Sequence, residues 1–163
     1  MGMAPHLSIT ENMIADKLGW KRFFKSGVRD KRAVKEYGDE MVKQYLIFCK
    51  SQDVAINSLS GGNIQKAIVG REFLQDNDLL IIEDPTRGID VGAIEFIWQK
   101  IIDIAGKGVS VLLVSHELGE VMELSDRILV MYNGEIVGNL ENTPDLDEKT
   151  IGLYMLGGKR DEI

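Results

Sequence analysis

The first part of the chain, residues 1 to about 76, places its apolar residues at helical spacing and contains no convincing strand. The longest such pattern lies in residues 29–50, where apolar side chains recur every three or four positions on one helix face. The members of this face are Val34, Tyr37, Met41, Tyr45 and Phe48. Ser8 and Glu11 have the spacing of a capping box, and Ser60 predicts the N-cap of a third helix. The sequence therefore predicts a helical N-terminal part.

The pattern changes at about residue 78, where short apolar runs alternate with helical segments. "DLLIIE" and "VSVLLVS" are apolar and end abruptly, which is typical of strands covered on both faces. Further on, Asn133 and Gly134 mark the turn of a hairpin. A strand, a helix and a second strand predict an α/β fold with a parallel sheet and right-handed crossovers. The predicted elements are strand 78–83, helix 90–108, strand 109–115, helix 117–125, hairpin 127–140 and helix 147–158.

Composition narrows the class of protein. A chain of 163 residues with 44% hydrophobic and 28% charged residues fits one ordinary globular domain. The net charge of −7 argues against nucleic acid as a partner, and the basic segment 17–35 is interpreted as a solvated helix face. The single cysteine, Cys49, rules out an internal disulfide bond. The apolar runs are short, so any role at a membrane is expected to be peripheral.

Polar residues follow both predicted parallel strands. "LLII" runs into Glu83 and Asp84, and "VLLV" runs into Ser115 and His116. Ligands of open parallel sheets bind beyond the carboxyl ends of the strands, so these side chains are expected to face one crevice. The alternative is that they only cap the strands or the helices that follow.

A third candidate site is "LSGGN", residues 59–63. Ser60 stands at a predicted helix start, and Gly61 and Gly62 leave the backbone N–H groups there exposed. The positive end of a helix with free N–H groups is suited to a phosphate. Chemistry is therefore predicted at three places along the chain.

The order and spacing of "LSGGN", "LLIIEDPT", "GID" and "LLVSH" resemble the ATP-binding cassette (ABC) ATPases. "PTRGIDVGA" and "LSDRILVMYNGEIVG" are similar to the wording of the sugar and nucleoside importer branch. The resemblance covers nearly the whole chain and is strongest over residues 57–138. It implies a partial P-loop NTPase sheet of the ABC type. Residues 1–76 would form the helical subdomain that carries the signature motif, and residues 77–163 the C-terminal part of the RecA-like ATPase core.

The resemblance also implies roles for single residues. The signature motif contacts the γ-phosphate of an ATP molecule held by a second nucleotide-binding domain, and its residues here are Ser60, Gly61, Gly62 and Asn63. Gly88, Ile89 and Asp90 match the D-loop, which crosses to the phosphate loop of that second domain. His116 matches the switch histidine, which hydrogen-bonds the γ-phosphate. Ile64 departs from the glutamine that is common in this branch.

Two carboxylates at the end of "LLIIED" stand in the reverse of the family order, which is aspartate and then glutamate. In the family the aspartate holds Mg²⁺ through water and the glutamate polarises the attacking water. Glu83 therefore takes the metal position here, and Asp84 takes the catalytic position. Asp84 reaches about 1 Å less far than a glutamate would, and a misplacement of about 1 Å can lower a rate about 100-fold. Glu83 would crowd an ion that needs near-ideal octahedral geometry. We hypothesise a site that hydrolyses ATP poorly and still clamps nucleotide.

The chain contains no G-x-x-x-x-G-K-[ST] phosphate loop, which phosphoryl transfer requires. In the family that loop lies upstream of the signature motif, so the chain is interpreted as the C-terminal portion of a nucleotide-binding domain. ATP and Mg²⁺ are then expected only in a complete site, and ATPase activity only in the full assembly. The implied partners are a second nucleotide-binding domain and transmembrane permease subunits. The implied location is cytoplasmic, on the inner face of the cell membrane.

Two other functions stay open. A non-catalytic regulatory module would offer its signature residues to another ATPase, which the missing lysine and Asp84 favour. An ABC ATPase of DNA repair or translation is the second alternative. Such a protein would carry a long insertion between the two halves that hold the motifs, and the net negative charge of this chain disfavours nucleic acid as a partner. A sheet that lacks its central strand also exposes an edge, so we expect the isolated chain to self-associate.

Overall fold

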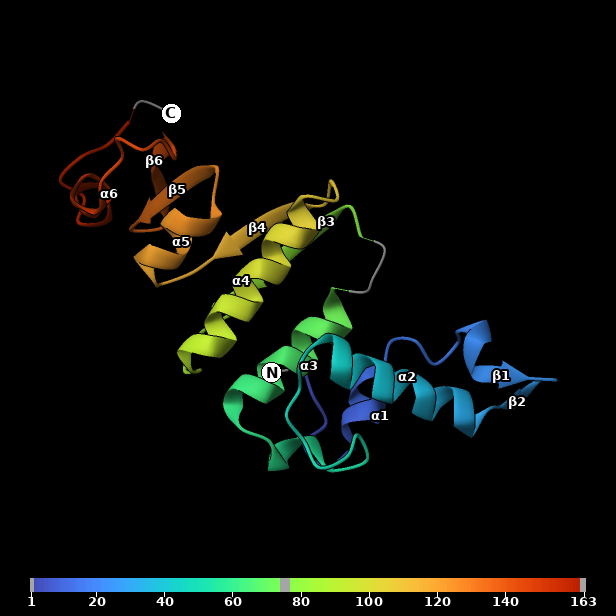
Figure 1. The fold of residues 1–163 in the computed structure, drawn as a ribbon. Coiled ribbons are helices and arrows are strands. Elements are labelled where there is room, and N and C mark those ends of the chain that lie inside the picture. Colours follow the sequence, from blue (N-terminus) through green and yellow to red (C-terminus); the bar gives the residue numbers. More distant parts are fainter. Residues whose placement is uncertain (1, 74–76, 162–163) are drawn as a thin grey trace. The chain divides into compact units, whose positions relative to one another are not determined.

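The computed structural model describes residues 2–73 and 77–161 and divides the chain into two compact units. The first unit contains the chain up to Asp78 together with Pro85–Val109, and the second contains Leu79–Asp84 and the chain from Ser110 onward. Figure 1 labels the elements along the chain. The predicted domain boundary touches residue 76, which lies outside the described residues, and it stays a prediction.

Four α-helices and two short 3-10 helices lie in the described part of the first unit. Polar side chains begin them: Ser8 and Glu11 form the predicted capping box, with the Glu11 carboxylate 2.8 Å from the Ser8 backbone nitrogen, and Asp30 and Asp90 cap two later helices. Buried apolar side chains from every helix make the core, and they include Ile9, Met13, Tyr37, Met41, Ala67, Val69, Ala93, Ile97 and Ile101. The elements are α1 (Ile9–Met13), η1 (Lys21–Phe23), β1 (Phe24–Lys25), β2 (Val28–Arg29), α2 (Lys31–Gln44), η2 (Ile56–Ser58), α3 (Gly61–Glu72) and α4 (Val91–Ala105).

The predicted apolar face of α2 is confirmed at three positions and wrong at one. Tyr37, Met41 and Tyr45 are buried, and Val34 is half-buried. Phe48 is 86% exposed, because α2 ends at Gln44 and the chain leaves the helix direction soon afterwards. A pattern of spacing cannot show where a helix stops when no glycine or proline marks the end.

A short hairpin, β1 and β2, corrects the prediction of a purely helical first part. Its strands pair antiparallel, with Phe24 opposite Arg29 and Lys25 opposite Val28. The turn residues Ser26 and Gly27 have φ angles of 52° and 78°. Positive φ at both central residues is what a type I′ turn requires.

The second unit contains the predicted strands. β3 (Leu79–Glu83) pairs in parallel with β4 (Ser110–Val114), and β5 (Arg127–Tyr132) forms the predicted hairpin with β6 (Glu135–Glu141). Its turn lies at Asn133 and Gly134, whose φ angles are 50° and 81°. Two helices, α5 (Leu118–Leu124) and α6 (Glu148–Met155), complete the unit. The core of the unit contains Ile128, Val130, Val137, Ile151 and Tyr154. The right-handed crossover stays a prediction, since α4 belongs to the other unit.

The parallel strands are not covered on both faces, which corrects a second prediction. Leu79 and Ile81 of β3 are 54% and 64% exposed, and Leu112 and Val114 of β4 are both 46% exposed. Their register places all four side chains on the same face. Among the described residues, β3 and β4 pair only with each other, so each has one unpaired edge. An apolar run of this kind predicts burial on both faces, and one face of these strands is exposed instead.

We expect the isolated chain to self-associate through this face and these edges. Light scattering over a range of concentrations is expected to show a mass that rises with concentration. The double substitution Ile81→Lys and Leu112→Lys is expected to shift the chain toward the monomer. Leu156→Lys, at a side chain that is 78% exposed directly after α6, provides the matched control and is expected to behave like the unchanged chain. A monomer at all concentrations would contradict the expectation.

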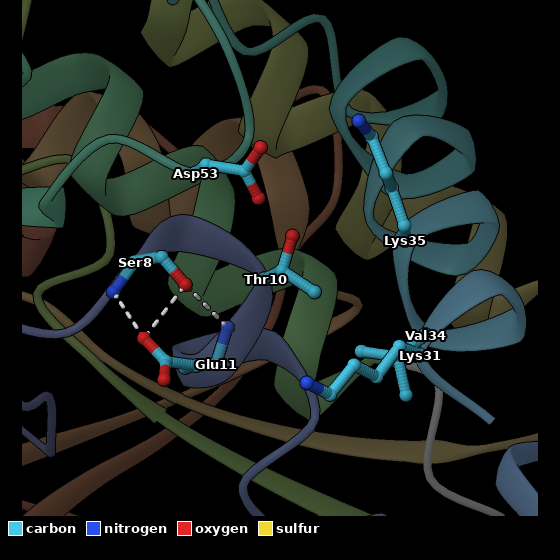
Figure 2. A pocket seen from close by; sticks show the side chains of 7 residues that line it. All are labelled: Ser8, Thr10, Glu11, Lys31, Val34, Lys35 and Asp53. Atoms are coloured by element: carbon cyan, nitrogen blue, oxygen red, sulfur yellow. Dashed lines mark hydrogen bonds between the residues drawn. The ribbon is translucent and has the colours of Figure 1, made fainter. Parts of the chain in front are cut away.

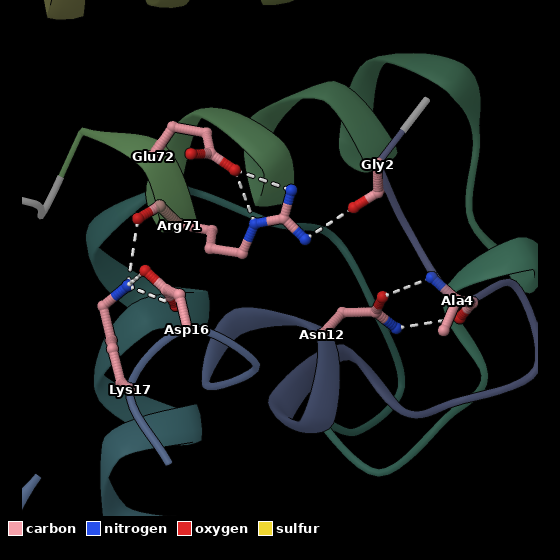
Figure 3. A network of polar contacts seen from close by, with 7 residues as sticks. All are labelled: Gly2, Ala4, Asn12, Asp16, Lys17, Arg71 and Glu72. Atoms are coloured by element: carbon pink, nitrogen blue, oxygen red, sulfur yellow. Dashed lines mark hydrogen bonds and ion pairs between the residues drawn. The ribbon is translucent and has the colours of Figure 1, made fainter. Parts of the chain in front are cut away.

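A buried lysine holds the C-terminal end of α3. The Lys17 side chain is 1% exposed, and its Nζ lies 2.6 Å from Asp16 Oδ2 and 3.0 Å from the carbonyl oxygen of Arg71 (Figure 3). Arg71 is in the last turn of α3, where carbonyl groups have no partner within the helix. The Arg71 guanidinium in turn donates to the Gly2 carbonyl and pairs with Glu72. The chain before α1 and the end of α3 are therefore joined by one polar network.

Candidate functional site

The predicted signature residues stand at the exposed N-terminal end of α3. Ser60 is the N-cap, as predicted, but its hydroxyl does not cap the helix. It accepts a hydrogen bond of 2.9 Å from Asn63 Nδ2, while Asn63 Oδ1 accepts one of 2.7 Å from the Phe48 backbone N–H. Asn63 therefore ties the cap residue to the loop after α2. The first N–H groups of α3 keep their predicted capacity for an anion, because no side chain caps them.

Gly62 lies against the start of α4. A Cβ atom at this position would lie 2.7 Å from Asp90 Oδ2 and 3.1 Å from the Cβ of Ala93. The nearer distance is too short for any side chain, so only glycine fits without a shift. Asp90 in turn caps α4, since its Oδ1 accepts a 3.0 Å hydrogen bond from the Ala93 N–H.

Signature residues and D-loop residues therefore meet within the first unit. The Gly88 carbonyl oxygen lies 3.7 Å from the position that a Cβ on Gly61 would take. Gly88 itself has a φ angle of 73°, a conformation that favours glycine. Sequence reasoning missed this contact, because nothing in either segment alone points to the other.

The two strand ends of the second unit also meet, as the argument from parallel strands predicted. His116 donates its backbone N–H to Asp84 Oδ1 at 3.1 Å, and its Nδ1 lies 2.9 Å from both carboxylate oxygens. A carboxylate only accepts, so this contact requires a hydrogen on Nδ1 of His116. The Asp84 side chain is 14% exposed and the His116 side chain 79% exposed. Ser115 fits the capping alternative, because its hydroxyl accepts from the Glu117 N–H.

Glu83 lies apart from this pair. It is the last residue of β3, its side chain is exposed, and within the described part of the chain it makes no hydrogen bond or ion pair. Asp84 continues the ladder by donating its N–H to the Val114 carbonyl at 2.8 Å, with a φ angle of 43°. Residues 2–73 and 77–161 contain no group of three or more His, Cys, Asp or Glu side chains placed to hold a metal ion.

A hollow of about 400 Å³ lies elsewhere in the first unit (Figure 2). Lys31, Val34 and Lys35 of α2 line one side of it. Glu11 lies on another side, and its pKa is below the usual value because the Ser8 backbone N–H and hydroxyl donate to its carboxylate. None of the predicted site residues lines this hollow; its lining residues are Ser8, Thr10, Glu11, Lys31, Val34, Lys35 and Asp53.

Curated proteins similar to this chain are import ATP-binding proteins. The guanosine import ATP-binding protein of Bacillus subtilis is 38% identical over 161 residues, which are 99% of this chain and 31% of that protein. The glucose import ATP-binding protein of Haloferax volcanii is 41% identical over 160 residues, 96% of this chain and 29% of that protein. The chain spans about a third of the length of the curated relatives that it matches. No family model matches it.

Solved structures show the same fold. The dimeric cassette of a bacterial ABC transporter superposes with a TM-score of 0.70 at 20% identity, over 87% of this chain and 60% of that one. An ATP-binding subunit of an ABC transporter superposes with a TM-score of 0.72 at 15% identity, over 94% of this chain and 64% of that one. The predicted α/β fold of the ABC type is confirmed. The chain is therefore a homologue of sugar and nucleoside import ATP-binding proteins, with the fold of ABC transporter ATP-binding cassettes.

Proposed function

We propose that the chain is the C-terminal part of the ATP-binding subunit of a sugar or nucleoside importer and supplies half of a composite ATP site. The observation that carries this proposal is the N-terminal end of α3. Its N–H groups are uncapped by any side chain, and Gly62 fits closely against the D-loop residue Asp90. An exposed helix N-terminus of this kind suits a phosphate that another polypeptide segment presents.

The signature residues would bind the γ-phosphate of an ATP molecule held by a second nucleotide-binding domain. Gly61 is exposed and has no side chain to cover the first N–H groups of α3, and the Ser60 hydroxyl is oriented by Asn63. Because Ser60 accepts from Asn63, its own hydrogen is free to be donated to a phosphate oxygen. Asp90 would keep the D-loop against this end of α3.

His116 and Asp84 would act on the other side of a complete site. The Asp84 carboxylate fixes the ring of His116 through Nδ1 and leaves Nε2 facing away from the carboxylate. With a hydrogen on both ring nitrogens, Nε2 would donate to a phosphate oxygen. Bound Mg²⁺ would neutralise phosphate charge in that site, and Glu83 is the residue available to hold it through water. ATP and Mg²⁺ both belong to the complete site in this proposal.

The partners and the location follow from the same proposal. A second nucleotide-binding domain would carry the phosphate loop, and permease subunits would place the assembly at the inner face of the membrane. None of the helices among the described residues is long and apolar enough to span a bilayer. A non-catalytic module is the second candidate function. The hydrogen bonds between His116 and Asp84 favour it, because they occupy the carboxylate that would otherwise act on the attacking water.

We expect the isolated chain to show no detectable heat of Mg-ATP binding in calorimetry, because it has no phosphate loop. Mixed with a cassette whose sequence contains a G-x-x-x-x-G-K-[ST] phosphate loop, it is expected to associate only when ATP is present. Gly61→Arg is expected to abolish this association, because a Cβ there meets nothing closer than 3.7 Å and the longer side chain would occupy the phosphate position.

Gly119→Arg provides the matched control, since a Cβ on this glycine in α5 has no neighbour within 4 Å. It is expected to leave the ATP-dependent association unchanged. ATP binding by the isolated chain at micromolar strength would show a phosphate cradle within these residues and would overturn the proposal.

A further inference from the structure

A basic segment with exposed apolar side chains precedes α2. Residues 17–35 contain eight Lys and Arg and a single acid, Asp30, in a chain whose net charge is −7. The structure corrects the interpretation of this segment as a helix face, because its middle is the β1–β2 hairpin. Figure 1 shows the hairpin at the N-terminal end of α2, away from α3.

Both faces of the hairpin combine a cation with an apolar side chain. Phe24 stands opposite Arg29 and Lys25 opposite Val28, and neighbouring residues of a strand point to opposite faces. Phe24 is 42% exposed and Val28 70% exposed. We call these four residues, together with Lys21, the hairpin patch.

Several cations of the segment are already neutralised. Arg22 pairs with Glu40 at 2.5 Å, and Arg32 pairs with Glu36 at 2.8 Å. Lys17 is buried against Asp16. Within the described part of the chain Lys31 and Lys35 make no ion pair, but they lie outside the hairpin and line a hollow that the carboxylates of Glu11 and Asp53 also line (Figure 2).

The cations of the hairpin patch have no such neutralisation. Among the described residues, the side chains of Lys21, Lys25 and Arg29 make no hydrogen bond or ion pair, and Arg29 acts only as a nearby charge that helps to lower the pKa of Glu11. The hairpin patch therefore concentrates positive charge and apolar surface on a chain that is otherwise acidic.

We propose that the hairpin patch docks on an anionic lipid surface. The hairpin would enter tip first, so that both of its faces meet the lipid. Lys21, Lys25 and Arg29 would contact the headgroups, while Phe24 and Val28 would enter the boundary between headgroups and acyl chains. Cations at such a surface each strengthen binding about fivefold at moderate salt, and aromatic and aliphatic side chains add to this at the interface. The hairpin needs no nucleotide for this contact. The lipid proposal depends on the proposed function in one respect, which is that an importer subunit works next to a membrane.

The hairpin patch favours lipid over nucleic acid. Val28 is the most exposed apolar side chain of the hairpin. It is aliphatic, so no nucleic-acid base can stack on it, and a surface that binds nucleic acid would have no use for it. The rest of the chain carries an excess of acids, which would repel an extended polyanion beyond the hairpin. A lipid surface needs to touch only the projecting hairpin.

The test is flotation of the 163-residue chain with vesicles at about 0.1 M salt. Vesicles of phosphatidylcholine with about a third phosphatidylserine are expected to carry the chain, and pure phosphatidylcholine vesicles are not. The triple substitution Lys21→Glu, Lys25→Glu and Arg29→Glu is expected to weaken binding about 100-fold, since three cations are lost at about fivefold each. Phe24→Ser with Val28→Ser is expected to weaken binding at unchanged charge.

Lys50→Glu, Lys107→Glu and Lys149→Glu form the control triple, with the same change in net charge at exposed lysines outside the segment. Equal loss in the two triples, or binding that does not depend on phosphatidylserine, would overturn the proposal. So would capture by a single-stranded oligonucleotide at the same salt together with no flotation. Because this readout uses no nucleotide, its failure would leave the proposed ATP site standing, and a failed ATP experiment would leave the lipid contact standing.

Discussion

Exchanging the two carboxylates at the end of β3, by Glu83→Asp together with Asp84→Glu, is expected to raise ATP turnover about 100-fold in the complete, assembled subunit. The proposed role of position 84 is to polarise the attacking water. A glutamate reaches about 1 Å farther than Asp84, and about 1 Å of misplacement at a reacting centre can cost about 2.7 kcal/mol of barrier. Position 83 would regain the shorter carboxylate that leaves room for hydrated Mg²⁺.

The structure adds a second reason to expect that Asp84 supports His116 and does not act as the catalytic base. Its carboxylate accepts from both the backbone N–H and Nδ1 of His116, so it orients the histidine. Its φ angle of 43° is a conformation that aspartate adopts more readily than glutamate. The exchange is therefore expected to cost about 1 kcal/mol of folding stability while turnover rises.

Steady-state ATP hydrolysis and thermal unfolding of the same samples check this pair of expectations. Asp84→Asn with Glu83 unchanged is the control, and it is expected to give no gain in turnover, since an amide cannot take up a proton from water. Unchanged turnover in the double variant would contradict the hypothesis of an impaired hydrolytic site. A rise of the same size in the control would assign the effect to the freed His116.

Local chemistry made much of the fold predictable. The capping box at Ser8 and Glu11 and the turn at Asn133 and Gly134 are decided by a few adjacent residues, and both are confirmed. The β1–β2 hairpin was not predicted, because its two-residue strands are too short to show an alternation of polar and apolar residues. The dipeptide Ser26-Gly27 was the available signal, as its residues have the positive φ angles of a tight turn.

Long-range contacts set the limit of prediction at the candidate site. Parallel strands bring their ends together by geometry, so the meeting of Asp84 and His116 could be foreseen. The contact of Gly62 with Asp90 depends on how α3 packs on α4, which neither helix pattern encodes. The exposed face at Ile81 could not be foreseen either, because an apolar run predicts a covering partner and not its presence in the chain.

Replacing the buried lysine by Lys17→Ala is expected to destabilise the first unit by about 3 kcal/mol. The substitution removes a charge that is buried with its partners: Asp16 would lose its ion pair, and the carbonyl of Arg71 would lose its donor. The Asp16 side chain is 28% exposed, so water can solvate its carboxylate in part after the ion pair is lost. We therefore expect a destabilisation at the low end of the range for broken buried ion pairs. Lys17 also lies over the Trp20 ring at 5.5 Å, and that contact would be lost as well.

Lys17→Met separates charge from packing. Methionine keeps most of the apolar stem and fills the same space, so the loss is expected to be smaller than for alanine and to reflect the broken ion pair between Lys17 and Asp16. Lys21→Met, at an exposed lysine in η1, is the control and is expected to change the free energy of unfolding by less than about 0.5 kcal/mol. Urea denaturation of the three variants beside the unchanged chain measures these differences.

The loss is expected to reach the signature residues through α3. Lys17 holds one end of this helix, and the N–H groups proposed to bind phosphate stand at the other end. Amide hydrogen exchange in Lys17→Ala is therefore expected to increase first in the last turn of α3 and around Arg71, and ATP-dependent association with a phosphate-loop cassette is expected to weaken. If Lys17→Ala proves as stable as Lys21→Met, Lys17 does not hold α3, and the network at Arg71 is a surface arrangement with no bearing on the site.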